Sequence, residues 1–212
     1  NIRNICFDSK LIELSEVLLT KVCNRRNIYL SIIERNNNIF GIVFKRVYIF
    51  FTRFRSARSN SDRYVSSRYY LIRRVQQLGI YNKFNYCFSH SGKYSAVLFS
   101  SETGHLSVDI EPVGRRLTKS LKIKVRSIYK DLILPELMVI MILETLVKLP
   151  IFDPPISLSK GIPHVGGIKM NALENNVFEI NVSNVKVYSK IYTFAGLHIC
   201  ITLESNQFDL SL

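Results

Sequence analysis

The sequence predicts an α+β protein, and two patterns in its 212 residues support this class. Apolar segments rich in β-branched and aromatic residues recur along the chain, as is typical of strands. Two longer segments, residues 61–78 and 135–149, carry the apolar spacing of helices. Each half of the chain therefore offers strands around one central helix. The length suffices for one domain with a substantial core or for two lobes of about 100 residues each.

Composition argues against several classes of protein. Hydrophobic residues make up 47% of the chain, which is too many for a disordered protein. No apolar run reaches the roughly 20 residues that cross a bilayer, and the first residues resemble neither a secretory signal nor a transit peptide. We therefore expect a cytoplasmic protein with no membrane partner. The four cysteines and four histidines lack the spacing of a zinc site or a disulfide framework.

The chain is strongly basic. It has 29 Lys and Arg residues against 16 Asp and Glu residues, which gives a formal net charge of +13. A surface of this kind attracts polyanions. Nucleic acid, a cofactor with several phosphates and an acidic protein are all compatible with the charge, which alone does not rank them.

In the first half, residues 11–22 carry a helical stripe, and residues 28–33 and 39–51 are strand-like. The helix expected at residues 61–78 follows a basic stretch. Arg63 lies in its first turn, where the backbone N–H groups of a helix favour anions. Most arginines of this region are better explained as a solvated basic face.

In the second half, a basic segment leads to the helix expected at residues 135–149, which begins with a proline suited to the first turn. Glu144 and Lys148 lie four residues apart on one face of this helix, in the favourable order for an ion pair. Strands are expected at residues 156–158, 177–182, 185–192 and 198–203. The alternation within residues 185–192 predicts a sheet with one solvent-facing side.

The most informative stretch is residues 88–112. It contains a polar turn, Ser89-His90-Ser91-Gly92, then an apolar strand at residues 94–99, then a second apolar run that ends in Asp109-Ile110-Glu111. Side chains two apart in a strand point to the same side, so both carboxylates should share one face, with Ile110 on the other. Such a pair is suited to a hard divalent cation.

The order SHSG, hydrophobic strand, short polar turn and VDIEP resembles the 4'-phosphopantetheinyl transferases, in particular the two-lobed monomeric type of peptide synthetase, polyketide and siderophore pathways. Directly before the VDIEP segment, Ser107 occupies the position where that family usually has Gly. The family's third motif, Trp-x-x-Lys-Glu-x-x-x-Lys, is matched by residues 140–148. Glu144 and Lys148 are kept there, whereas Ile140 and Leu143 replace the Trp and the first Lys.

The resemblance implies a fold of two pseudo-duplicated lobes, each a small sheet packed on a central helix. Residues 1–105 would form the N-terminal lobe, with the coenzyme A-binding helix and the SHSG turn. Residues 106–212 would form the C-terminal lobe, with the metal carboxylates and the carrier-protein side. A chain of this type would work as a monomer, because both halves of the cleft lie in one chain.

The resemblance also implies a reaction, the Mg²⁺-dependent transfer of 4'-phosphopantetheine from coenzyme A to a serine of an acyl- or peptidyl-carrier protein, leaving adenosine 3',5'-bisphosphate. The implied metal ligands are Asp109, Glu111 and Glu144. Glu144 would also be the catalytic base, and Lys148 the second catalytic residue. The implied coenzyme A-binding residues are Arg63, Arg68, Ser89, His90, Asp109 and Lys148.

Alternatives stay open for each assignment. Asp109 and Glu111 are also compatible with solvated carboxylates at a strand end, and Glu144 and Lys148 with a simple ion pair. The incomplete third motif is expected to weaken any transferase activity, so that Leu143→Lys should raise it. It is also compatible with a homologue that binds coenzyme A or a carrier protein without turnover. Tyrosines beside arginines keep a nucleic-acid-binding protein as a third hypothesis.

Overall fold

The computed structural model describes residues 28–34, 68, 84–100, 104–129, 134–152, 158–159, 162–163, 168–182, 184–194 and 196–204. These residues contain both strands and helices, so the α+β class is confirmed. The expected helix at residues 11–22, the strand at residues 39–51 and the helix at residues 61–78 lie outside them, apart from Arg68. Among the helices that the structure describes, none combines the length and the apolar character needed to cross a bilayer.

A three-stranded antiparallel sheet is formed by the first half of the chain. β3 (Tyr94–Ser100) is its central strand and pairs with β1 (Ile28–Glu34) on one side and β2 (Asn85–Ser91) on the other. The strands expected at residues 28–33 and 94–99 are thereby confirmed.

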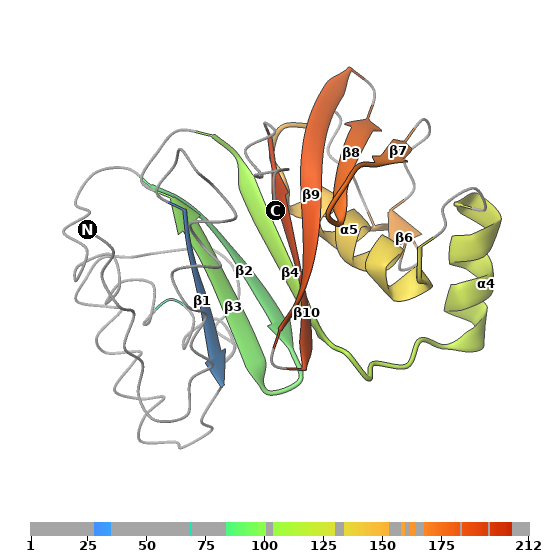
Figure 1. Ribbon diagram of the computed structural model, residues 1–212, viewed down its shortest axis with the longest axis horizontal. Coiled ribbons are helices and arrows are strands. Elements are labelled where there is room, and N and C mark those ends of the chain that lie inside the picture. Colours follow the sequence, from blue (N-terminus) through green and yellow to red (C-terminus); the bar gives the residue numbers. More distant parts are fainter. Residues whose placement is uncertain are drawn as a thin grey trace.

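A five-stranded antiparallel sheet is formed by the second half, in the order β4-β10-β9-β8-β7. Its strands are β4 (Leu106–Pro112), β7 (Lys169–Ala172), β8 (Val177–Val182), β9 (Val185–Phe194) and β10 (Leu197–Leu203). Three of the expected strands are confirmed here. A small third sheet pairs β5 (Leu158–Ser159) with β6 (Ile162–Pro163). Figure 1 shows β4 between the other strands of its own sheet and the three-stranded sheet.

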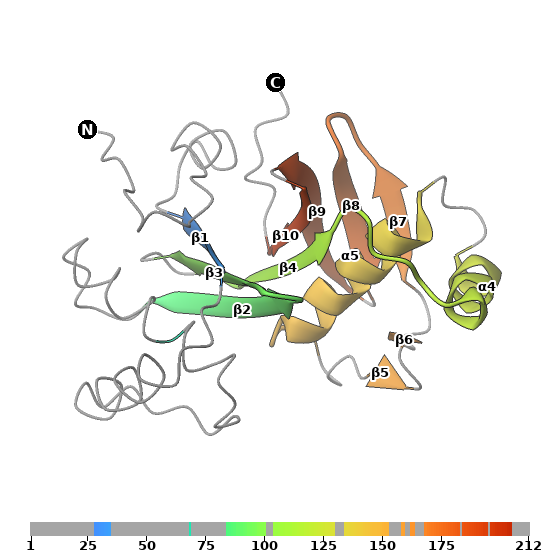
Figure 2. The same ribbon diagram turned by 90° about the horizontal axis from the view of Figure 1, so that it is seen from below.

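The five-stranded sheet is covered on both faces. Apolar side chains of β4 and β10, such as Ile110 and Ile199, form one core with β1 and β3. The opposite face packs against α5 (Glu136–Lys148) and α4 (Lys119–Ile128). Figure 2 shows α5 running across the sheet near β4. The predicted solvent-facing side of β9 is therefore wrong at Lys190, which is 7% exposed because the sheet is enclosed at that point.

α5 begins after Pro135 and ends at Lys148, as the sequence predicts. It is apolar on most sides, with a series of buried residues from Val139 to Leu146, and so lies deep in the second core. α4 is capped by the Thr118 hydroxyl, which accepts a hydrogen bond from the Leu121 amide at 3.4 Å. In α4 only Val125 is buried, whereas most residues of α5 are, so α5 is the helix that can position side chains against the sheet.

The predicted polar turn at residues 89–92 is wrong in its extent. Ser89, His90 and Ser91 belong to β2 and pair with β3, and only Gly92 and Lys93 form the turn. Gly92 has a φ of +53°, a left-handed conformation that glycine adopts without steric cost. The serines can extend the strand because their hydroxyls bind acceptors on β4 rather than their own backbone.

Candidate functional site

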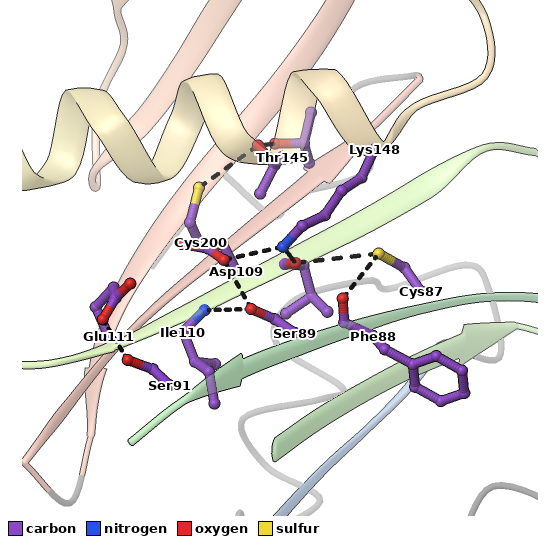
Figure 3. Close-up of polar contacts among 12 residues, drawn as sticks. Cys87, Phe88, Ser89, Ser91, Asp109, Ile110, Glu111, Thr145, Lys148 and Cys200 are labelled. Atoms are coloured by element: carbon purple, nitrogen blue, oxygen red, sulfur yellow. Dashed lines mark hydrogen bonds and ion pairs between the residues drawn. The ribbon is translucent and has the colours of Figure 1, made fainter. Parts of the chain in front are cut away.

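The site lies where β4 meets β2. The two strands run in the same direction, as the contacts from Ser89 to Asp109 and from Ser91 to Glu111 indicate (Figure 2). Among the described residues no backbone ladder joins them. Instead, side chains form hydrogen bonds with the backbone groups along this edge of β4. The carbonyl of Val108 accepts a hydrogen bond from Lys148 Nζ at 2.9 Å, and the amide of Ile110 donates to Ser89 Oγ at 3.2 Å. Figure 3 shows these contacts converging from β2, β4 and α5.

Asp109 is the centre of this cluster. It is 3% exposed, and its Oδ1 accepts hydrogen bonds from Ser89 Oγ at 2.7 Å and from Lys148 Nζ at 2.9 Å. Its other oxygen, Oδ2, is buried and receives no N–H or hydroxyl hydrogen bond within the described part of the chain. The Glu144 carboxyl also interacts with Asp109 through a side-chain hydrogen bond, for which the protonated form of Glu144 is the donor. Carboxylate oxygens in such a place are suitable ligands for a hard cation.

Glu144 lies one helical turn before Lys148, on the side of α5 that faces Asp109. Burial and the neighbouring Asp109 carboxylate raise the pKa of Glu144, although Lys148 and Arg115 act in the opposite direction. For Lys148, burial lowers the pKa, but the attraction of Asp109 and other anionic neighbours outweighs it and the net change is upward. Lys148 therefore stays a cation beside two carboxyl groups that repel each other.

Glu111 shares the face of β4 that carries Asp109, which confirms the predicted alternation. It is 4% exposed, and both of its oxygens have partners. Oε1 forms an ion pair with Arg115, and Oε2 accepts a hydrogen bond from Ser91 Oγ. The second carboxylate of VDIE is thus held by a cation of its own chain.

The chemistry of Asp109, Glu111 and Glu144 suits a divalent cation, because carboxylate oxygens are the ligands that Mg²⁺ prefers. However, within the described ranges no group of three His, Cys, Asp or Glu side chains has the arrangement to hold a metal ion. Glu111 is the residue turned to other partners. Asp109, Glu144 and Glu111 are the carboxylates that would hold such an ion, and Glu111 would first have to leave Arg115.

The structure does not bring His90 to the cluster, and it gives little on two other predicted residues. His90 alternates with Ser89 and Ser91 along β2, so its ring lies on the opposite face, where Nδ1 is 2.8 Å from Ser95 Oγ. Arg68 is buried at 7% exposure. Arg63 lies outside the described residues.

Sequence reasoning missed several contributors. Ser91 could have been found from its spacing of two from Ser89, and Arg115 from its spacing of four from Glu111. Thr145 carried no signal, yet its hydroxyl donates to the Ile142 carbonyl at 2.7 Å and lies 2.5 Å from Thr202 Oγ1. The contact between Thr145 and Thr202 attaches α5 to β10, and it thereby helps to position Glu144 and Lys148 relative to β4.

The cysteines near the site are poor nucleophiles. Cys87 Sγ lies 4.0 Å from the Val108 carbonyl, and burial raises its pKa. Cys200, opposite Asp109 on β10, is fully enclosed, and burial raises its pKa to about 12. Burial therefore keeps both thiols protonated at neutral pH, which makes them weak nucleophiles.

The two residues that depart from the third motif both pack in the second core. Leu143 is 0% exposed and Ile140 is 6% exposed. A lysine at position 143 would bury an ammonium group among apolar side chains. We expect Leu143→Lys to disrupt the packing of α5, and its effect on activity stays a prediction.

No protein-family model matches the chain, and a search of the curated proteins finds no match either.

Proposed function

We propose that this chain is a Mg²⁺-dependent 4'-phosphopantetheinyl transferase that modifies a serine of an acyl- or peptidyl-carrier protein. One observation carries the proposal. Ser89, Asp109 and Lys148 come from three separate segments, the SHSG, VDIE and Glu-x-x-x-Lys segments, and they meet in one hydrogen-bonded cluster. Segments that merely resembled the motifs by chance would have no reason to converge.

In the proposed site, Asp109, Glu144 and Glu111 hold the ion, which when bound neutralises charge on the diphosphate of coenzyme A. Glu144 is the candidate base for the carrier serine, because its carboxyl group lies beside Asp109, at the centre of the cluster. Lys148 uses two contacts to fix Asp109 and the Val108 carbonyl. An ammonium group has three donors, so the third can bind a phosphate oxygen.

We also propose that the two sheets correspond to the two lobes, residues 1–105 and 106–212. The junction between β2 and β4 would then be the junction between lobes, with the cluster at its centre. The hydroxyl of Ser89 is already used by Asp109 and Ile110. Its role would be to orient the carboxylate, rather than to contact coenzyme A through its side chain.

The test is mass spectrometry of a purified apo carrier protein after incubation with this protein, coenzyme A and Mg²⁺. A gain of the phosphopantetheine mass is expected, and Asp109→Asn and Glu144→Gln should lower the rate by at least about 100-fold. The matched control is Glu179→Gln, since Glu179 is also a sheet carboxylate paired with a lysine, at 3.0 Å from Lys186. No gain with several carriers, or equal losses in the control, would contradict the proposal.

A second candidate is a homologue that binds coenzyme A or a carrier protein without turnover. Two observations favour it. The buried Leu143 supplies no cation where the motif has a lysine, and Arg115 occupies the Glu111 carboxylate that would bind the metal ion. Calorimetry with coenzyme A separates the two candidates. Binding without any transfer supports the second candidate, and transfer excludes it.

A further inference from the structure

Arg115 enters the site from the turn after β4. The Arg115 amide donates to the Pro112 carbonyl at 2.9 Å, and the Val113 amide donates to the Gly196 carbonyl at 3.0 Å. These bonds fold the chain back over the end of β4 and attach it to the hairpin between β9 and β10. The Arg115 side chain, 39% exposed, is thereby directed from solvent onto Glu111, whose side chain is 5% exposed.

Two ion pairs lie at the site, Lys148–Asp109 and Arg115–Glu111, and their cations differ in exposure and in number of partners. Lys148 is bound to Asp109 and also to a backbone carbonyl, and its side chain is 28% exposed. Arg115 has the more exposed side chain and acts electrostatically on Glu144 as well as on Glu111. The exposed guanidinium of Arg115 is easily solvated when it leaves, and it would leave one buried acceptor, Glu111 Oε1, whereas Lys148 would leave two.

We propose that Arg115 is an exchangeable counter-ion, which holds Glu111 in the metal-free chain and is displaced from it by a divalent cation. The inference rests on the proposed function, because it takes Asp109, Glu111 and Glu144 as the ligand set. It accounts for one feature of the cluster, that Arg115 and Ser91 engage both Glu111 oxygens, whereas Asp109 Oδ2 has no donor other than the Glu144 carboxyl within the described residues. Arg115 then sets the cation concentration at which the site fills.

Calorimetric titration of Mn²⁺ into the full chain tests the exchange without any transfer reaction. Arg115→Gln should bind Mn²⁺ about tenfold more tightly than the parent, since the competing cation is gone; tenfold corresponds to about 1.4 kcal/mol. Arg116→Gln is the matched control, because it removes the same charge from the next residue, and it should bind like the parent. Glu111→Gln should bind more weakly, and the double variant Glu111→Gln with Arg115→Gln should lose the gain.

Two results would overturn the inference. If Arg115→Gln binds Mn²⁺ no better than the parent while Glu111→Gln binds it more weakly, the metal site stands and Arg115 is not its competitor. If no variant binds Mn²⁺, the exchange and the proposed metal site fall together. Tighter binding by Arg115→Gln with no modification of any carrier protein would support the exchange and contradict the transferase.

Discussion

The two long edges of β4 are held in different ways. Along one edge, β4 pairs with β10 through a regular antiparallel ladder from Leu106↔Leu203 to Pro112↔Leu197. Along the other, it meets β2 through the side chains of Ser89, Ser91 and Lys148. The first edge depends on backbone groups that every residue except proline supplies, and the second depends on particular hydroxyl, carboxyl and ammonium groups.

This difference separates stability from chemistry within a single strand. A ladder tolerates many side chains, because its hydrogen bonds belong to the backbone. The edge beside β2 does not, since each of its groups satisfies a specific partner. Four substitutions test the contrast, in order of decreasing expected effect.

Asp109→Ala should have the largest effect on stability. The substitution removes the carboxylate to which the Lys148 ammonium and the Ser89 hydroxyl donate hydrogen bonds. Breaking a buried charged pair of this kind lowers the free energy of unfolding by about 3 kcal/mol. Ile199→Val, on the ladder edge, should cost about 1 kcal/mol because it removes one methyl group and leaves the backbone bonds in place. Urea unfolding of both variants measures the difference, and equal losses would mean that the two edges are alike.

Ser89→Ala should follow, with a loss of about 2 kcal/mol. The substitution removes a donor to Asp109 and an acceptor for the Ile110 amide in one step, and both partners are buried. Ser127→Ala removes an exposed hydroxyl on α4 and should stay within about 0.5 kcal/mol of the parent. A Ser89 variant as stable as the Ser127 variant would show that the hydroxyl does not hold this edge.

Glu144→Gln should stabilise the protein at neutral pH. The folded chain raises the pKa of Glu144 above its ordinary value of 4.5, so the folded state binds more protons than the unfolded state just above that pH. Stability is therefore lost as the pH rises through this window, and the neutral amide avoids the loss. The melting temperature of the variant should exceed that of the parent at pH 7, and the two should converge below about pH 4. A constant difference across this range would contradict the assignment.

Ser107→Ala should have the smallest effect on stability, and it should be stabilising, whereas Asp109→Ala and Ser89→Ala are destabilising. Ser107 lies on the α5-facing side of β4, and its hydroxyl is buried with no hydrogen-bond partner among the residues that the structure describes. Removing an unsatisfied hydroxyl while keeping the small side chain should stabilise the fold by up to about 1 kcal/mol. Thermal unfolding is the measurement, and a clear destabilisation would indicate a partner for this hydroxyl.

The sequence was sufficient for the local part of this site. Period-two alternation correctly placed Asp109 and Glu111 on one face, and helical spacing correctly placed Glu144 beside Lys148. It was insufficient wherever the outcome depended on a partner far along the chain. His90 looked equivalent to Ser89 until pairing with β3 turned its ring to the other face, and Lys190 looked exposed until a second sheet covered it.

The pairing of β4 with β10 also has a consequence for the order of folding during synthesis. Residues 106–112 leave the ribosome long before residues 197–203, yet the latter form the backbone ladder of β4. Closing so long a loop is entropically costly, and sheets that depend on such pairings form slowly. Until β10 arrives, one edge of β4 has open amide and carbonyl groups that a second nascent chain could bind. A chain cut before Leu197 is therefore expected to self-associate through the very strand that carries the two carboxylates.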